Sequence, residues 1–368
     1  MGVIVSCSKD EPAPAKEQPT PQQTNFPTIK NFSAQEVTVG DIITIEGENF
    51  VPSQTYTITF NGVKGTIKEV TSNHLKVEIP EEATSGEVIL SSNETSKSIG
   101  RLTILPKPSV LYAYDLRNHK IVRLDLQTGK ELETIAEIGK EYLGRGIYYL
   151  KSTNEIIGIQ SGNSGHYLFK LNVTTKEIIR LPCNHYEKLI IANNEPYAYD
   201  LRNHKIVKLD LQTGKELETI AEVGSDYLSH IRFSKSTNEI IGEQTKYNAE
   251  TSERKNSLFK LNLTTKQIVK APFKGYERLI VANDKLYAYV AYNKIVKLDL
   301  QTGKELETIA EIGKNYLSRI QFSKSTNEII GLQLGNENEE TYFKLNLKTK
   351  QFSRTPLKRY ESFIIANY

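Results

Sequence analysis

Six segments of this 368-residue chain place a tyrosine within three residues of an arginine, histidine or lysine. Tyrosine rings can stack on sugar faces, and cationic groups pair with carboxylate or sulfate groups. These segments precede predicted innermost strands of a repeated fold, so we expect them near one mouth of a central channel. The candidate ligand-binding residues are Tyr142, Arg145, Tyr227, His230, Tyr316, Arg319, Tyr186, Lys188, Tyr276, Arg278 and Tyr360.

Acidic neighbours leave a second interpretation open. Glu187, Glu277 and Glu361 stand next to three of the cationic segments and would instead tie them into structural ion pairs. The sequence contains no tryptophan, which is the larger platform for stacking on sugars.

Catalytic and metal-binding patterns are missing from the sequence. There is no Gly-x-Ser-x-Gly, His-Glu-x-x-His, Walker or EF-hand pattern. Cys183 precedes His185 by two residues, but its equivalents in the other repeats are Phe273 and Leu357, which indicates an apolar position. His74 stands alone. We therefore expect no metal, no cofactor and no catalytic residue.

Composition excludes several classes of protein. The chain has 47 basic and 44 acidic residues and a net charge of +3, which does not favour a nucleic-acid partner. Two cysteines are too few for a disulfide framework or a cysteine-built zinc site. No apolar run reaches the roughly 18 residues of a spanning helix.

Long internal repeats predict the architecture of residues 106–368. The segment Leu126–Ala136 recurs verbatim at 211–221 and 300–310, and Lys151–Gly158 recurs at 235–242 and 324–331. Each repeat contains eight short runs typical of strands, and periods of about 40 to 50 residues are typical of propeller blades. We therefore predict six four-stranded blades in three pairs.

The first blade lacks its innermost strand, and the C-terminus supplies a match for it. Ser362–Asn367 parallels Lys188–Asn193 and Arg278–Asn283. The last strand is therefore expected to complete the first blade and close the ring, which removes two open sheet edges. The Leu-Asp-Leu-x-Thr-Gly-Lys-x-Leu core resembles blades of the PQQ-like and YVTN-like propellers.

Repetition and divergence have different meanings in such a chain. Asp125, Asp210 and Asp299 recur at one strand position, which indicates folding chemistry. By contrast, three loops differ in length and composition, although the sequences on either side of them do not. Loops on a rigid scaffold concentrate binding residues. These loops are 161–166, 245–256 and 334–341; drift without selection is the alternative.

Residues 27–105 have a different pattern, with short alternating runs bounded by Gly, Asn and Pro. The segments Pro27–Ile29, Val39–Phe50 and Phe60–Val63 resemble the IPT/TIG immunoglobulin-like family. The resemblance implies a β-sandwich that acts as a spacer or interaction module. The fold prediction is thus all-β throughout, an immunoglobulin-like sandwich followed by a six-bladed propeller.

Residues 1–26 are rich in Pro, Gln, Thr and charge and are expected to form a disordered tether. Ile4–Cys7 resembles a bacterial lipobox, in which Cys7 carries the lipid, and Asp10-Glu11 resembles an export signal to the outer face of the outer membrane. Met1-Gly2 with Ser6 also matches the N-myristoylation pattern. An unmodified tail is the third alternative.

These observations favour a non-enzymatic, lipid-anchored surface protein of the outer membrane that binds a glycan or an extracellular protein on the propeller's loop face. The lipid would be its membrane attachment. The alternatives are a scaffold in an outer-membrane complex and, less favoured, a propeller lyase or hydrolase.

Overall fold

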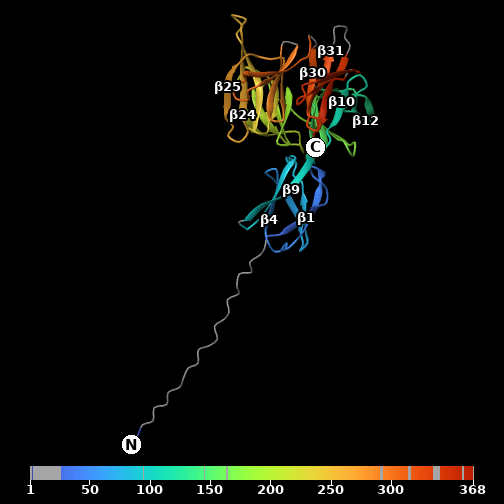
Figure 1. The fold of residues 1–368 in the computed structure, drawn as a ribbon. Coiled ribbons are helices and arrows are strands. Elements are labelled where there is room, and N and C mark those ends of the chain that lie inside the picture. The colour runs from blue at the N-terminus through green and yellow to red at the C-terminus, as the bar shows by residue number, and fades with distance from the viewer. Residues whose placement is uncertain are drawn as a thin grey trace. The chain divides into compact units, whose positions relative to one another are not determined.

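The computed structural model describes residues 2, 26–93, 95–144, 146–162, 165–290, 293–313, 316–334, 340–358 and 360–367. Every regular element in these residues is a strand (Figure 1). The chain divides into two compact units, Met1–Leu105 and Pro106–Tyr368. Cys7 and the predicted tether, except Gly2 and Phe26, lie outside the described residues.

The first unit contains two sheets, with the strand orders β1-β3-β7-β6 and β2-β9-β8-β4-β5. Its strands are β1 (Thr28–Phe32), β2 (Glu36–Thr38), β3 (Ile42–Glu48), β4 (Tyr56–Phe60), β5 (Val63–Lys64), β6 (Thr66–Val70), β7 (His74–Glu78), β8 (Gly86–Ser92) and β9 (Thr95–Leu105). All neighbours pair antiparallel except β2 and β9.

Alternation explains why this unit is a sandwich. In β4 the residues Tyr56, Ile58 and Phe60 are buried and the threonines between them are half-buried. One apolar core joins such positions from both sheets, for example Ile45 and Val77 with Ile58 and Val88. The β4–β5 turn has φ of 47° at Asn61 and 87° at Gly62, which suits the Asn-Gly pair of a tight hairpin.

The second unit contains six antiparallel sheets in the part of the chain that the structure describes. The first sheet contains β10 (Val110–Asp115), β11 (Lys120–Leu124), β12 (Glu131–Glu137) and β34 (Ser362–Ala366), and the second contains β13 (Tyr142–Leu143), β14 (Tyr148–Leu150), β15 (Glu155–Gly162), β16 (Gly165–Asn172) and β17 (Ile178–Pro182). The third contains β18 (Lys188–Ala192), β19 (Glu195–Asp200), β20 (Lys205–Leu209) and β21 (Glu216–Glu222), and the fourth contains β22 (Tyr227–Ser234), β23 (Glu239–Tyr247), β24 (Arg254–Asn262) and β25 (Ile268–Phe273). The fifth contains β26 (Arg278–Ala282), β27 (Lys285–Val290), β28 (Lys294–Leu298) and β29 (Glu305–Glu311), and the sixth contains β30 (Tyr316–Ser323), β31 (Glu328–Leu334), β32 (Glu340–Asn346) and β33 (Phe352–Pro356).

The six sheets form a closed ring, with the innermost strand of each sheet at the centre. β14, β18, β22, β26, β30 and β34 each contact the next, and β34 contacts β14 again. Six apolar clusters fill the spaces between neighbouring sheets; one of them joins Val122 of β11 and Phe363 of β34 to Ile330 of β31. Both faces of each sheet are therefore covered, and the inner edges converge on the centre of the ring.

The C-terminal strand closes this ring, as the repeat pattern predicts. β34 pairs antiparallel with β10, with Tyr112 opposite Ile364 and Tyr114 opposite Ser362. The pairing joins the two ends of the second unit in one sheet and covers one edge of β10 and one edge of β34.

The repeated turns have a common structure. An Asp125 carboxylate oxygen accepts hydrogen bonds from the backbone N–H groups of Gln127 and Thr128 and from the Thr128 hydroxyl, at 2.7 to 3.1 Å. Asp299 repeats this arrangement, and Asp210 keeps the bonds to Gln212 and Thr213. The recurring aspartates are therefore turn residues.

Candidate functional site

A cavity of about 1040 Å³ lies at the centre of the ring, and we call it the central cavity. The innermost strand of each of the six sheets, or the residues just before that strand, contributes to the wall of the cavity. One side chain from each strand occupies an equivalent place, and we call these the six ring positions. They are Tyr148, Lys188, Arg232, Arg278, Gln321 and Ser362.

The ring positions differ although their surroundings repeat. Lys188, Arg278 and Ser362 open three matching strands, and each is followed by a buried Leu or Phe. Tyr148, Arg232 and Gln321 hold one matching position in the other three. The three cationic members lie on β18, β22 and β26, which are neighbours in the ring, whereas the members on β30, β34 and β14 are uncharged. The cationic ring positions are therefore grouped on one side of the cavity, whereas Arg319 of β30 is paired with Glu361.

Backbone irregularities help to shape this wall. The pairing of β22 with β23 shifts register between Ser229 and Arg232, and that of β30 with β31 shifts between Ser318 and Gln321. Inside these bulges His230 has φ of 51° and Arg319 has φ of 52°. A bulge redirects a side chain, and both of these residues line the cavity.

A short network fixes His230 and Arg278. His230 Nδ1 lies 3.4 Å from Glu243 Oε2, and its Nε2 lies 3.3 Å from Arg278 Nη1. Because a guanidinium can only donate, Nε2 accepts and the proton of the neutral ring is on Nδ1. Burial, with Arg278 and Arg232 nearby, lowers the pKa of His230 despite Glu243, which keeps the ring neutral near pH 7. Arg278 Nη2 also donates to the Tyr316 hydroxyl at 2.6 Å.

Arg319 is paired with a carboxylate. Its Nη2 lies 3.6 Å from Glu361 Oε2, and its Nε donates to the Glu361 backbone oxygen at 2.7 Å. Arg319 therefore forms an ion pair within the protein, as the second interpretation of the sequence expects.

Lys188 and Arg232 are different. Among the described residues, no carboxylate lies within ion-pair distance of either, and the hydrogen bond of the Arg232 side chain goes to the Ile231 backbone oxygen at 2.9 Å. Burial, followed by Arg232 and Arg278, lowers the pKa of Lys188 to about 7, although Glu187 acts in the opposite direction. Burial also lowers the pKa of Arg232.

The structure brings six of the predicted site residues together in the cavity wall: Lys188, Tyr227, His230, Arg278, Tyr316 and Arg319. Tyr142 is exposed and donates to Glu361 at 3.2 Å, but it does not line the cavity. Arg145 lies outside the described residues.

Three predicted site residues belong instead to the core. Tyr186, Tyr276 and Tyr360 are 3%, 8% and 2% exposed, and each packs in an apolar cluster between neighbouring sheets. Their rings fill the space between neighbouring sheets. We therefore leave them out of the proposed site.

Sequence reasoning missed Tyr148, Arg232 and Gln321 as cavity residues. The sequence does contain a signal for them, because these three residues differ at one equivalent position of the repeats. That position lies in a strand, whereas binding residues were expected in the loops. Two of the predicted loops reach the cavity, one of them through Leu334 alone. Thr245, Tyr247 and Arg254, from the β23–β24 hairpin, line it.

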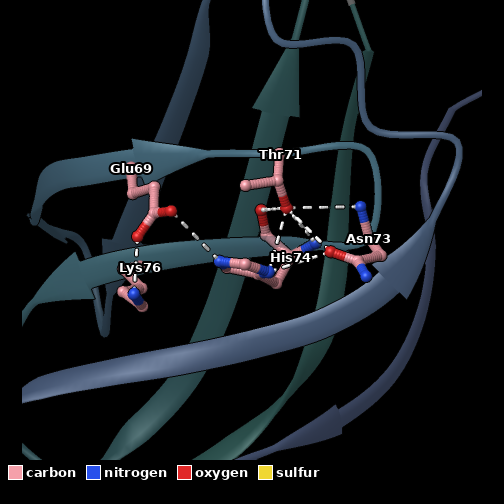
Figure 2. A network of polar contacts seen from close by, with 5 residues as sticks. All are labelled: Glu69, Thr71, Asn73, His74 and Lys76. Carbon is pink, nitrogen blue, oxygen red and sulfur yellow. Dashed lines mark hydrogen bonds and ion pairs between the residues drawn. The ribbon is translucent and has the colours of Figure 1, made fainter.

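Two other potential sites contain no catalytic arrangement. At Cys183 and His185, burial raises the pKa of the Cys183 thiol to about 12, and the His185 ring packs against the His166 ring with the centroids 4.5 Å apart. In the first unit, His74 is held by Thr71 and Asn73 at 2.9 Å each (Figure 2). No group of three or more His, Cys, Asp or Glu side chains suited to a metal occurs within the described ranges.

The comparisons with known proteins identify the first unit. Residues 27–104 match the IPT/TIG domain family. This confirms the predicted domain, and the ring of sheets makes the second unit β-propeller-like, as predicted. No curated protein matches the sequence. No helix in the described part of the chain is long and apolar enough to cross a membrane.

Several solved structures are similar over most of the chain. A protein of unknown function from Bacteroides thetaiotaomicron is 10% identical, covers 91% of this chain and 87% of its own, and has a TM-score of 0.54. A chain of a nidogen/laminin complex is 10% identical over 70% of this chain and 98% of its own, with a TM-score of 0.52. A DUF4784 family protein from Bacteroides caccae is 16% identical over 92% and 99%, with a TM-score of 0.48. At these identities the similarity concerns the fold alone.

Proposed function

We propose that the second unit is a six-bladed propeller whose central cavity binds an extracellular ligand, and that the protein acts as a binding protein rather than an enzyme. The observation that carries this proposal is the contrast inside the repeats. Segments of the scaffold recur verbatim, yet the three equivalent ring positions within each set differ: Lys188, Arg278 and Ser362 in one set, and Tyr148, Arg232 and Gln321 in the other. A fold needs no such divergence, whereas a site for an asymmetric ligand does.

The cavity has the properties of a ligand site. Its volume of about 1040 Å³ is at the upper end of the range for small-molecule sites. Tyr227 at its wall is 47% exposed and offers a free ring face. Cations, amides and hydroxyl groups surround the same space, so that a polar ligand would find many hydrogen-bonding partners.

Binding is tested by thermal unfolding of the full chain with a panel of neutral and acidic polysaccharides. A saturable rise in Tm is expected with at least one of them. It should disappear in a Tyr227→Ala, Arg319→Asn double variant, in which Asn is chosen because it tolerates the positive φ of residue 319. Leu217→Ala, on the exposed face of β21, is the matched control. A shift that survives the double variant would place the ligand elsewhere.

One observation favours the enzymatic alternative. A lysine with a pKa of about 7 is able to accept a proton at neutral pH, and Arg232 beside it would neutralise a carboxylate of the substrate. Release of reducing ends or of an unsaturated product from the bound polysaccharide would establish a lyase or hydrolase. Unchanged polysaccharide after prolonged incubation supports a binding role.

The scaffold alternative would require a contiguous apolar surface. Leu132, Leu217 and Leu306 are the matching exposed leucines, at 55%, 60% and 59%, but they lie on three different sheets. We therefore place the scaffold role second to ligand binding.

We further propose that Cys7 carries a lipid that holds the protein at the outer face of the outer membrane. The support is the Ile4–Cys7 pattern with the acidic pair that follows it. Labelled palmitate should be incorporated and lost in Cys7→Ala. Incorporation of labelled myristate that is lost in Gly2→Ala would favour the rival anchor.

A further inference from the structure

We propose that Lys188, Arg232 and Arg278 form an anion-binding subsite that takes the carboxylate or sulfate groups of an acidic oligosaccharide. This inference rests on the proposed ligand-binding function of the central cavity, and it specifies the class of ligand.

The first argument is the arrangement of the three cations. They come from β18, β22 and β26, which are consecutive in the ring, and all three line one cavity. They are close enough that Arg232 and Arg278 act on the charge of Lys188. An acidic group in this part of the cavity would therefore be attracted by all three charges.

The second argument is the lack of compensation. The cavity wall contains five cationic side chains, namely Lys188, Arg232, Arg254, Arg278 and Arg319, and three carboxylates, namely Glu187, Glu243 and Glu361, among the described residues. Glu243 is engaged by His230 and by the Tyr276 N–H, and Glu361 by Arg319. Once Arg319 is set against Glu361, four cations remain against Glu187 and Glu243, so an excess of two positive charges is shared by Lys188, Arg232, Arg254 and Arg278.

Such an arrangement is unfavourable for the empty protein. Holding like charges together in a half-buried wall with too few counter-charges costs free energy, and a ligand that supplies the missing charge would offset this cost. The lowered pKa of Lys188 reflects this cost. Arg278 is also preorganised, because His230 and Tyr316 hold its guanidinium before any ligand arrives.

The uncharged groups in the wall favour a sugar as the carrier of the acidic groups. Tyr227 and Tyr247 are 47% and 58% exposed and offer ring faces. Across from the cations, Gln321 offers an amide, and the Ser362 hydroxyl has no hydrogen-bond partner among the described residues. Hydroxyl-rich rings bearing carboxylate or sulfate groups match this combination, and the cavity volume has room for several such rings.

The test is thermal unfolding of the full chain at about pH 6, where Lys188 is protonated because its pKa is about 7. The probes are an oligogalacturonate, a heparin oligosaccharide, a neutral maltooligosaccharide and polyglutamate. Sodium sulfate is compared with sodium chloride at equal ionic strength. The variants are Lys188→Ser and Arg232→Gln, because Ser362 and Gln321 already occupy the equivalent places in this fold. Lys215→Met, which removes an exposed lysine from a turn, is the matched control.

We expect sulfate and at least one acidic oligosaccharide to raise Tm in wild type and in the control. Each variant should weaken binding about tenfold or more, as loss of a desolvated charge contact does. Preference for the galacturonate or the heparin probe identifies the acidic group as carboxylate or sulfate.

Other outcomes overturn the proposal in distinguishable ways. A neutral probe that binds through Tyr227, without any effect of sulfate or the acidic sugars, would retain the binding function and refute the anion subsite. An acidic shift unchanged in both variants would refute the subsite as well. Equal binding of polyglutamate would refute the assignment to a sugar. No shift with any probe would contradict both the subsite and the proposed function.

Discussion

The outer hairpins and the innermost strands of the second unit differ in one respect. In the hairpins, Asp125, Asp210 and Asp299 occupy turns of identical sequence and form matching hydrogen bonds. In the innermost strands, equivalent places hold Lys188, Arg278 and Ser362. Both regions belong to the same three repeats, so a difference in origin or in backbone fold does not explain why one is uniform and the other is not.

The comparison separates two requirements on one backbone. A turn must satisfy its own polar groups in every copy, and one solution serves all three. A cavity wall on the ring axis faces one ligand, so its six positions need not agree. Residues that face the core beside those positions stay apolar, as Leu189, Leu279 and Phe363 do. The predictions that follow test this separation, beginning with the largest effect.

Phe363→Ala should destabilise the second unit strongly. Phe363 is 1% exposed, contacts Tyr342 and Tyr360, and sits on the strand that closes the ring. Loss of a buried aromatic ring costs about 3–5 kcal/mol. Urea unfolding followed by circular dichroism measures it. Ser362→Ala, one residue away but at a ring position, should change stability by less than about 0.5 kcal/mol. Equal losses in the two variants would mean that the ring positions are structural after all.

Lys188→Met should stabilise the protein without ligand, because it removes an uncompensated buried charge. We expect a gain of about 1 kcal/mol, or a rise in Tm of about 2–4 °C. The pKa of Lys188 is lowered from 10.5 to about 7, so the unfolded chain binds more protons between these values. Wild-type stability therefore rises with pH across that window, and the advantage of the variant is largest below about pH 7 and fades toward pH 10.5. A scan of Tm against pH for both proteins would contradict this account if the variant were less stable below pH 7.

Binding of an acidic ligand should depend on the same proton. Since an anion prefers the protonated lysine, affinity should fall as pH rises above about 7, the pKa of Lys188. Calorimetric titrations at several pH values measure this, and the dependence should flatten in Lys188→Met. A pH profile that is the same in both proteins would assign the titration to another group.

The smallest effects are expected in the turns. Asp125→Ala, Asp210→Ala and Asp299→Ala should each lower Tm slightly and to a similar extent, because each removes matching hydrogen bonds. The bonds to Thr128 and Thr302 lower the pKa of Asp125 and Asp299, and the bond to the Gln212 N–H, followed by that to Thr213, lowers the pKa of Asp210. This stability is therefore present above their ordinary pKa and is lost as pH falls through the lowered one. A much larger effect in one copy would show that the repeats are not equivalent outside the cavity.

Most of the fold was accessible from the sequence. Verbatim repeats located the hairpins, and the match of Ser362–Asn367 to Lys188–Asn193 predicted the pairing of β34 with β10. In the first unit, alternation predicted strands at β2, β3, β4, β7, β8 and β9 but not at β1, β5 and β6. All three are edge strands of their sheets, and β5 has only two residues, so their alternation carries little signal.

The site was accessible only in part. Lys188, Arg278 and the pair at His230 and Arg319 were identified because tyrosine and charge occur together in sequence. Sequence spacing did not show that Tyr186 turns into the core while Lys188, two residues later, turns into the cavity. Nor did it show the bulges at His230 and Arg319, which depend on the pairing of β22 and β30 with their neighbours.

The central claim is that divergence at the ring positions creates the site. It is tested most directly by making five of those positions match, with Lys188→Ser, Arg278→Ser and Arg232→Gln in one variant, so that β18 and β26 match Ser362 of β34 and β22 matches Gln321 of β30. Thermal unfolding and calorimetric titration with the heparin and galacturonate oligosaccharides are measured on this variant and on wild type. The account predicts a folded variant with an unchanged or higher Tm that no longer binds the acidic sugar. A variant that binds as wild type does, or that fails to fold, would contradict it.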